Sequence, residues 1–388
     1  MQSIYVGTTL GHILKIADDF TTLTLVFDVG GAGNPLNDGS TITEVYSPVQ
    51  GDFNGLIFFG CMRNTANQVV WLSIGPQTQL NGAYAGGATL TVDATAAFPA
   101  SVATARTIFV NNDDFTYTGT TATTFTGVAG LAAQSDNDVV GYVAVSGSRN
   151  TTDPVRTAPW YEFGDVGFGN RMHLFLATDP AAGAGVVWRI DTTDGSGDNT
   201  NTAPAAAVQA PIVSNYTGRI YGADKSNPAR LFAVNQFAAG FTTIFTNSDA
   251  SGGPVEADIW YDFDADNLFY GDTNGFLHGS DTVDGSALNG GLNFPNQPSG
   301  GATAIRSGPL SLAGNPAVGS QVVWVGNDSG TVYVEDVSNT IAPVFKQYRV
   351  SGAVGSIAAF TSGGSQVIMV STTSGRLYLF PDEVDPSP

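Results

Sequence analysis

Two short segments that echo each other carry the acidic side chains best placed for chemistry. They read "APWYEF" (158–163) and "DIWYDF" (258–263), so Glu162 and Asp262 occupy matching positions. Each segment precedes a longer apolar run, which predicts two innermost strands in separate β-sheet units. Carboxylates that face one another across a central channel could bind a cation or act as the catalytic pair of a carbohydrate-active enzyme.

The same segments also allow an interpretation without chemistry. Trp160 and Trp260 would pack in the core between neighbouring units, and the two acids would be solvated in the channel. We favour this interpretation, because no spacing in the sequence suggests a nucleophile beside a base. The prediction is therefore a non-enzymatic protein with no catalytic residue.

A second acidic segment, "DFDADNLFYGD", places Asp262, Asp264 and Asp266 at alternate positions. Alternating carboxylates are typical of calcium loops. This segment lacks the glycine and the distal bidentate glutamate of an EF-hand, and a strand-like run follows at once. We predict a turn rich in aspartate and no metal site, and we keep the three residues as weak calcium candidates.

Histidine and cysteine chemistry is sparse. His12, His173 and His278 lie in or beside strand-like runs, where surface strand positions are the favoured interpretation. Cys61 is the only cysteine, so no intramolecular disulfide can form, and a small buried strand residue is expected. The sequence contains no phosphate-binding or dinucleotide-binding fingerprint, and we predict no cofactor.

The charge balance restricts the partners. The 388 residues include 34 Asp and Glu against 14 Lys and Arg, a formal net charge of −20. Such an acidic surface repels phosphates, so sequence-specific nucleic-acid binding is not expected. The opening residues lack a secretory signal, and no apolar run is long enough to span a bilayer, so we predict no membrane insertion.

One phrase, an apolar run followed by a small polar turn and a second apolar run, recurs seven times. Most copies start about 45 to 55 residues apart, and the interval from the second to the third is longer by about 60. The copies are "IYVGTTLGHILKI" from Ile4, "LIFFGCMRNTANQVVWL" from Leu56, "HLFLATDPAAGAGVVWRID" from His173, "RIYGADKSNPARLFAV" from Arg219, "LFYGDTNGFLHGSD" from Leu268, "VVWVGNDSGTVYVED" from Val322 and "VIMVSTTSGRLYLFPD" from Val367.

Each phrase predicts two antiparallel strands joined by a tight turn. Between phrases there is room for two more strands, for example residues 22–29 and 41–49. Four strands at this period predict an all-β fold, a β-propeller of seven blades, with six as the alternative count. The first unit lacks an innermost strand before Ile4. The last has a candidate innermost strand at 354–360 but little after Phe380 for a fourth.

The phrase has a common pattern: apolar residues, Gly, then Thr, Asp or Asn, two further residues, Gly, one residue, Leu or Val, and Tyr or His. This pattern resembles the repeat of the quinoprotein-like (PQQ-like) β-propellers. The resemblance covers most of the chain outside residues 80–146 and implies architecture rather than activity. The chain lacks the family's tryptophan at the end of each repeat and its adjacent-cysteine pair, so binding of the quinone cofactor is not implied.

Residues 86–130 form the insertion, and their alternating Thr-rich runs predict a small antiparallel module. The insertion resembles a short β module embedded in phage virion proteins, often tail or fibre components. A generic Thr-rich β insertion is the alternative. The predicted organisation is residues 1–79 for the first two blades, 80–146 for the module and 147–388 for the remaining blades. The matching residues are Leu90-Thr91-Val92-Asp93, Phe98-Pro99, Tyr117-Thr118-Gly119 and Thr123-Thr124-Phe125-Thr126-Gly127-Val128.

These observations leave three functional hypotheses. The leading one is a virion structural protein, a tail, fibre or capsid-decoration component, in an oligomeric assembly with other virion proteins formed in the host cytoplasm. The second is an adhesin module, extracellular or at a cell surface, that binds host glycans or proteins through its loops. The third is a carbohydrate-active enzyme that uses Glu162 and Asp262.

Overall fold

The computed structural model shows an all-β chain, with no α-helix among the residues that it describes. No described segment forms a helix long and apolar enough to cross a membrane. The chain divides into two compact units, residues 1–159 and 160–388. The structure describes residues 2–18, 22–51, 55–162, 173–193, 198–209, 213–214, 218–237, 240–248, 252–263, 265–288, 294–295, 303–315, 320–337, 344–362 and 365–381.

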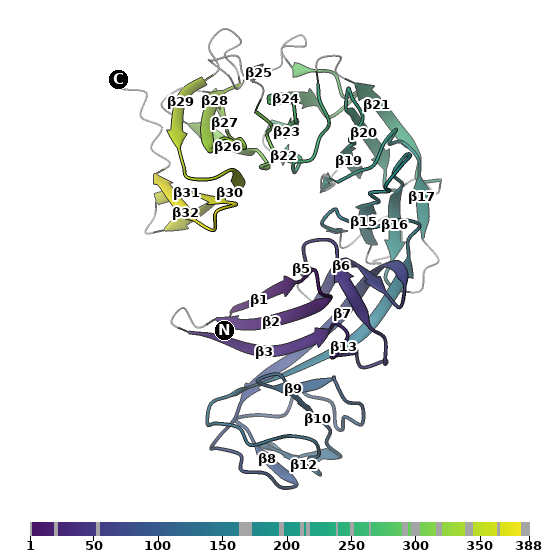
Figure 1. The fold of residues 1–388 in the computed structure, drawn as a ribbon, viewed down its shortest axis with the longest axis vertical. Coiled ribbons are helices and arrows are strands. Elements are labelled where there is room, and N and C mark those ends of the chain that lie inside the picture. Colours follow the sequence, from purple (N-terminus) through teal and green to yellow (C-terminus); the bar gives the residue numbers. More distant parts are fainter. Residues whose placement is uncertain are drawn as a thin grey trace. The chain divides into compact units, whose positions relative to one another are not determined.

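The unit of residues 160–388 consists of five antiparallel sheets that follow one another in sequence order, from teal to yellow in Figure 1. Within each sheet, every strand pairs with the strand that precedes it in the chain. Four sheets have four strands and the last has three among the described residues. The strands are β14 (Trp160–Glu162), β15 (His173–Ala177), β16 (Val187–Asp191), β17 (Asn199–Asn201); β18 (Val213–Ser214), β19 (Arg219–Ala223), β20 (Arg230–Asn235), β21 (Thr243–Ser248); β22 (Trp260–Asp262), β23 (Asn267–Gly271), β24 (Phe276–Asp281), β25 (Phe294–Pro295); β26 (Leu310–Asn315), β27 (Ser320–Gly326), β28 (Thr331–Asp336), β29 (Val344–Arg349); and β30 (Val354–Ser362), β31 (Ser365–Thr372), β32 (Leu377–Pro381).

The unit of residues 1–159 begins with a three-stranded sheet and continues with a larger one. In the larger sheet, the order β4-β6-β7-β13 repeats the four-stranded pattern, and β9 and β10 extend it. The strands of these two sheets are β1 (Gln2–Gly7), β2 (His12–Asp18), β3 (Leu23–Gly30), β4 (Ile42–Val45), β5 (Gln50–Gly51), β6 (Leu56–Arg63), β7 (Ala66–Gln79), β9 (Ile108–Val110), β10 (Asp113–Phe115) and β13 (Val139–Asn150).

Between β7 and β13 the chain also forms a small module, whose core includes residues of β9 and β13 from the larger sheet. Strands β8 (Thr89–Thr91), β11 (Gly119–Thr120) and β12 (Thr124–Thr126) make a separate sheet in the order β11-β12-β8. Phe125 lies at the centre of the aromatic core, with its ring centroid 4.7 Å from that of Tyr117 and 5.2 Å from that of Phe98. The antiparallel character expected for the insertion is therefore present.

The repeat analysis is confirmed strand by strand. Each of the seven phrases forms an antiparallel hairpin, and seven sheets carry the expected strand order. The sheet of β1–β3 has no strand before β1, and that of β30–β32 has no strand after β32 among the described residues, as predicted for both end units. The hairpins are β1–β2, β6–β7, β15–β16, β19–β20, β23–β24, β27–β28 and β31–β32.

In several hairpins the first strand is apolar on both faces because it is covered on both faces, whereas Ile4 and Val6 of β1 remain 43% and 38% exposed. All five residues of β15 (sequence "HLFLA") are buried, and β23 (sequence "NLFYG") is buried after its first residue. A strand with only one covered face would alternate apolar and polar residues. Continuous apolar strands therefore indicate sheets packed face to face.

Candidate functional site

In four of the hairpins one polar side chain closes the tight turn. In the β23–β24 turn, Asp272 Oδ1 accepts the backbone N–H of Phe276 at 2.8 Å. In three other turns a polar side chain likewise accepts the backbone N–H of the residue four positions later. This bond replaces a backbone hydrogen bond that the turn removes. The repeats are Thr8 with His12 (3.0 Å), Asn327 with Thr331 (3.1 Å) and Thr372 with Arg376 (3.3 Å). The glycine that precedes the donor in these four turns has a positive φ, between 75° and 88°.

The same turn residues connect each sheet to the next through short backbone clips. We define the clips as Ala207-Val208, Pro254-Val255, Ala304-Ile305 and Ala353-Val354. The second clip residue donates its N–H to the turn-residue carbonyl of the preceding sheet, as Ile305 does to Asp272 at 2.9 Å. The first accepts an N–H from the next sheet, as Ala304 does from Asp328 at 2.9 Å. All four clips make both bonds.

The clips explain a feature of the repeat that the sequence alone left unexplained. A Cβ atom on Gly271 would overlap the side chain of Ile305, and one on Gly326 would overlap Val354. Glycine therefore precedes the turn residue at these two positions because any larger side chain would displace the aliphatic clip residue that packs on the strand. Sequence analysis missed the clips, although Ala or Pro followed by Val or Ile recurs before each later sheet and would have marked them.

Charged side chains lie directly beside these clips and turns, on what we call the turn face. Lys225 Nζ lies 3.1 Å from Asp179 Oδ1 and 3.2 Å from Gln209 Oε1, and so joins two neighbouring sheets. The turn face is defined by the polar residues that follow the turn residues and the clips: Asp179, Gln209, Lys225, Glu256, Arg306 and Asp328.

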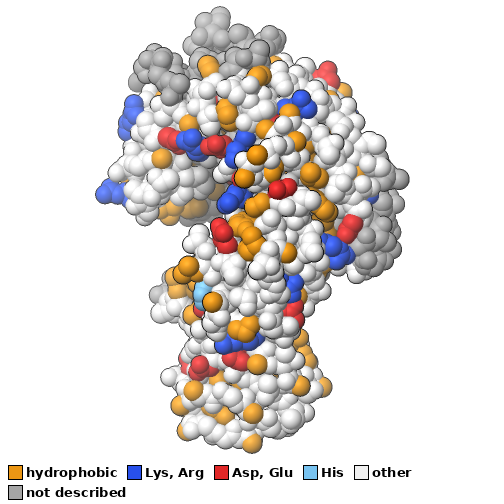
Figure 2. Space-filling view, turned by 45° about the vertical axis from the view of Figure 1, so that its right-hand side comes forward, with side chains coloured by type: hydrophobic (Ala, Val, Ile, Leu, Met, Phe, Trp, Pro, Cys, Tyr) orange, Lys and Arg blue, Asp and Glu red, His pale blue; other side chains and the backbone are white. Residues whose placement is uncertain are grey.

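Arg306 forms the second bridge of the turn face. Its Nε donates to Glu256 Oε2 at 2.7 Å, and its Nη1 is paired with Asp328. The hydrogen bond to Glu256, together with the two acidic neighbours, raises the pKa of the guanidinium above its ordinary value. The side chain keeps 46% of its surface exposed, so it remains open to a partner. On the face drawn in Figure 2, acidic and basic side chains similarly lie next to each other.

The buried pair Asp272 and His278 supports one of these turns from within. His278 Nε2 lies 2.8 Å from Asp272 Oδ2, and both side chains are buried. Burial acts to raise the pKa of Asp272. The bonds from His278 and from the backbone N–H groups of Phe276 and Gly253 outweigh this effect and hold the pKa below its ordinary value. The pair is fully engaged in holding the turn.

The two acids expected to face a channel have different surroundings. Glu162 is half-buried and accepts the indole N–H of Trp160 at 3.1 Å. Asp262 is only 5% exposed, and it accepts the hydroxyl of Ser311 from β26 and the N–H of Ala265. The predicted channel-facing position is therefore wrong for Asp262, whose carboxylate binds the neighbouring sheet and closes the β22–β23 turn.

Of the other two calcium candidates, only Asp266 lies within the described residues. Asp266 accepts the hydroxyl of Tyr261 at 2.7 Å, and Asp264 lies outside the described residues. No group of three metal-ligating side chains occurs among the residues that the structure describes. Trp160 packs partly buried between two cores of its unit, whereas Trp260 remains 37% exposed.

The histidine prediction needs correction. His173 is 0% and His278 is 3% exposed, so neither is a surface strand residue. Both lie on strands that are covered on both faces. The alternation of apolar and polar residues in the sequence does not reveal such double coverage. His12 is half-buried, with Nδ1 2.7 Å from Asp28 Oδ1. Cys61 is buried on β6 as expected, and burial raises the pKa of its thiol to about 12.

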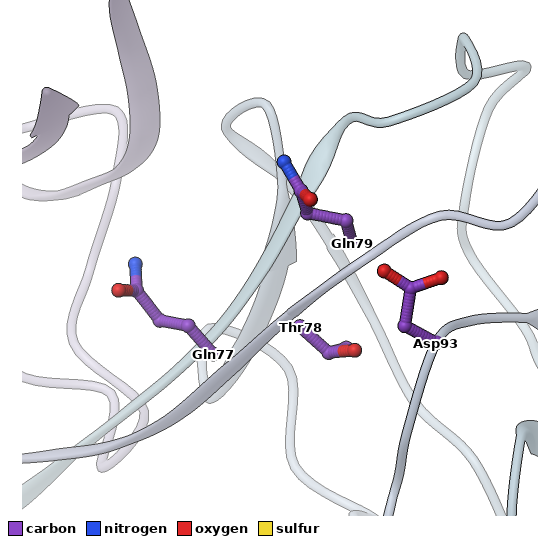
Figure 3. A pocket seen from close by; sticks show the side chains of 4 residues that line it. All are labelled: Gln77, Thr78, Gln79 and Asp93. Atoms are coloured by element: carbon purple, nitrogen blue, oxygen red, sulfur yellow. The ribbon is translucent and has the colours of Figure 1, made fainter. Parts of the chain in front are cut away.

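A shallow pocket of about 300 Å³ lies where β7 enters the inserted module (Figure 3). It is lined by Gln77, Thr78, Gln79 and Asp93. The Asp93 carboxylate faces the β7 strand, whereas the amide of Gln77 points away from it. These groups could bind the hydroxyls of a polar ligand, but they do not converge on one reacting atom.

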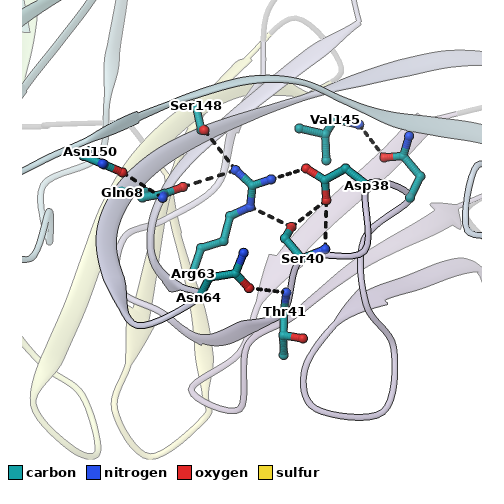
Figure 4. A network of polar contacts seen from close by, with 10 residues as sticks. Asp38, Ser40, Thr41, Arg63, Asn64, Gln68, Val145, Ser148 and Asn150 are labelled. Atoms are coloured by element: carbon teal, nitrogen blue, oxygen red, sulfur yellow. Dashed lines mark hydrogen bonds and ion pairs between the residues drawn. The ribbon is translucent and has the colours of Figure 1, made fainter.

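A larger polar network surrounds Arg63, which is buried between β6 and the loop before β4 (Figure 4). Its guanidinium donates to Ser40 Oγ at 2.7 Å and to Ser148 Oγ at 2.9 Å, and it is paired with Asp38. Because every branch ends on a protein group, the network fixes the loop rather than forming an open site.

Comparisons with known proteins identify the fold. No protein-family model and no curated protein matches the sequence. The structure is similar to that of Sqt1 from Saccharomyces cerevisiae, with a TM-score of 0.54 and 10% identity over 98% of this chain and 80% of that chain. Sqt1 from Chaetomium thermophilum gives a TM-score of 0.57 and 11% identity over 99% of this chain and 80% of that chain.

A further structure, Sqt1 from Chaetomium thermophilum bound to the N-terminus of the ribosomal protein L10, gives a TM-score of 0.52 with 11% identity. It covers 95% of this chain and 78% of that chain. At such low identity the likeness shows the fold alone. The chain is a β-propeller, as the repeats predicted. The resemblance of residues 86–130 to a phage module stays a prediction.

Proposed function

We propose that this chain is a non-enzymatic structural protein of a virion, a tail, fibre or capsid-decoration component, that binds a protein partner through its turn face. The observation that carries the binding role is the pair of ion bridges at Lys225 and Arg306, held on a backbone fixed by the clips. A preformed surface loses little entropy on binding. The similar Sqt1 fold, bound to the N-terminus of ribosomal protein L10, supports a protein partner.

The virion assignment rests on the insertion. Residues 86–130 resemble a module embedded in phage tail and fibre proteins, and its separate three-stranded sheet packs on an aromatic core that it shares with β9 and β13. Neighbouring genes for capsid, portal or tail proteins would support this placement.

The test is whether the protein is part of a purified particle. We expect mass spectrometry to find the chain at fixed stoichiometry in particles, and immunogold labelling to place it at the tail, fibre or capsid surface. The variant K225E/R306E should lower incorporation at least tenfold, because it reverses both cations of the turn face. R349E, a charge reversal on the exposed residue Arg349 of β29, is the matched control and should incorporate normally. Absence of the chain from particles would contradict the proposal.

Host glycan binding is the second candidate, favoured by the pocket at Gln77, Thr78, Gln79 and Asp93. If the pocket binds sugar hydroxyls, the variant D93N should lose signal on a glycan array while D153N, which changes an aspartate outside the pocket, keeps it. The third candidate, a carbohydrate-active enzyme, requires E162Q or D262N to abolish turnover of a glycan panel. The Asp262 carboxylate already accepts the hydroxyl of Ser311, which disfavours the enzyme hypothesis.

A further inference from the structure

The end of the β22–β25 sheet opposite the turn face displays two large apolar side chains to solvent. Phe263 follows β22 and is 58% exposed, and Val283 follows β24 and is 60% exposed. Exposed single apolar residues are common and mean little alone. These two differ because they lie at the same end of one sheet, on turns that neighbouring groups hold in place.

The strand register places the two side chains together. Asp262, Asn267 and Asp281 are consecutive cross-strand partners at the end of β22, β23 and β24. Adjacent strands are about 4.8 Å apart, so the turns after β22 and β24 start about 10 Å from each other. This end is opposite the turn face, because the β23–β24 turn at Asp272 lies at the other end of the same strands. A single short peptide could reach both Phe263 and Val283.

Both turns are held rigidly. The Phe263 ring packs edge-on against Tyr261, with centroids 4.5 Å apart. The N–H of Val283 donates to Asp281 Oδ1 at 2.6 Å, and its carbonyl oxygen accepts Arg219 Nη1 at 3.1 Å. The apolar side chains are therefore presented in a fixed geometry, which lowers the entropy that a partner must lose on binding.

The surroundings of these side chains are acidic. Asp266, Asp281 and Asp284 lie on the same turns, and Arg219 Nη1 donates to the carbonyl oxygens of Thr282 and Val283 beside them. Backbone and side-chain hydrogen bonds from Ser286 lower the pKa of Asp284, which keeps it ionised in neutral solution. Three carboxylates against one guanidinium, whose Nη1 already donates to two carbonyl oxygens, attract cations and repel anions.

We propose that this acidic end patch, defined by Phe263, Val283, Asp266, Asp281 and Asp284, docks a basic segment of a partner protein. The segment presents aliphatic or aromatic side chains to Phe263 and Val283, flanked by lysine or arginine for the aspartates. A second copy of this chain is a poor occupant, since each copy carries a formal net charge of −20. The proposal concerns a surface separate from the turn face and does not depend on the virion assignment.

The test uses the full chain and a short fluorescein-labelled peptide that alternates lysine and leucine, with affinity measured by fluorescence anisotropy. Peptides alternating glutamate with leucine and lysine with serine are the controls for charge and for apolar contact. The variants are F263S/V283S and D284N, because all three side chains are exposed and their replacement leaves the core intact. I244S, on the exposed residue Ile244 of β21, is the matched control.

We expect F263S/V283S to weaken the lysine–leucine peptide at least tenfold, D284N to weaken it severalfold, and I244S to leave it unchanged. The two control peptides should bind at least tenfold more weakly. Unchanged affinity in F263S/V283S, with thermal unfolding showing an intact fold, would overturn the proposal. Equal binding of the lysine–serine peptide would also overturn it, because attraction would then be purely electrostatic.

Discussion

The repeated sheets of residues 160–388 and the inserted module of the other unit are stabilised in different ways. Each sheet joins its neighbours through the same clip, turn residue and small strand residue, so that stability is divided among equivalent bonds. The module has one aromatic core, in which Phe125 contacts Phe98, Phe115 and Tyr117. When one contact is removed, the loss of stability should therefore be spread over neighbouring sheets in residues 160–388, but confined to the core in the module.

The largest expected effect is at the centre of the module. F125A should destabilise it by about 3–5 kcal/mol, because it removes a buried ring and leaves a cavity. Hydrogen exchange followed by mass spectrometry should show residues 86–130 exchanging faster while the sheets of residues 160–388 keep their protection. F125L, which retains most of the volume, should cost clearly less. Equal loss of protection in both regions would contradict the distinction.

Removal of one turn acceptor should be the most damaging change within a repeat. D272A leaves the buried His278 and the N–H groups of Phe276 and Gly253 without their acceptor, at a cost of about 3 kcal/mol. Thermal denaturation should show this loss, with D272N intermediate because its amide oxygen still accepts. T273A, at the next residue, serves as the control. A D272A variant as stable as the parent chain would refute the supporting role.

The same unit also contains a buried acid that should make its stability depend on pH. Glu335 on β28 is 0% exposed, and neither carboxylate oxygen has a hydrogen-bond partner among the described residues. Burial raises its pKa to about 8, so the folded state keeps a proton that the unfolded chain releases near pH 4.5. Its stabilising contribution is therefore complete below that lower pH and is lost as pH rises through about 8.

The variant E335Q measures this effect directly. Between pH 6 and pH 8 the parent chain should lose about 2 kcal/mol relative to E335Q, as followed by urea unfolding at each pH. D336N, which changes the neighbouring residue at the end of β28, is the control and should follow the parent profile. Parallel profiles for E335Q and the parent would show that Glu335 ionises normally.

The smallest effect is expected for a neutral turn residue. T372V removes the hydroxyl that accepts the N–H of Arg376, which should cost about 1 kcal/mol in urea unfolding. T373V changes the next, exposed residue and should cost less. A larger loss for T373V than for T372V would argue against the capping role of the repeated Thr, Asp or Asn.

The sequence predicted the repeat architecture because each hairpin has a local signature. An apolar strand, a turn with glycine and a second apolar strand are visible within about fifteen residues, as in the segment from Val322. Periodicity alone was enough for these features.

The sites were less predictable because they depend on contacts between sheets. Asp262 and Glu162 match in sequence, but Asp262 accepts the hydroxyl of Ser311 in the neighbouring sheet, whereas Glu162 accepts the indole N–H of Trp160. His173 and His278 read as surface residues because sequence does not show that both faces of their strands are covered. The ion bridges of Lys225 and Arg306 join residues 46 and 50 positions apart, beyond the reach of local patterns.

The clips are the central structural claim, and amide hydrogen exchange tests them most directly. We predict that the N–H groups of Val208, Val255, Ile305 and Val354 exchange as slowly as amides within β27, although the first three lie outside the strands. Exchange of these four amides at the rate of open loops, with the strands still protected, would contradict it.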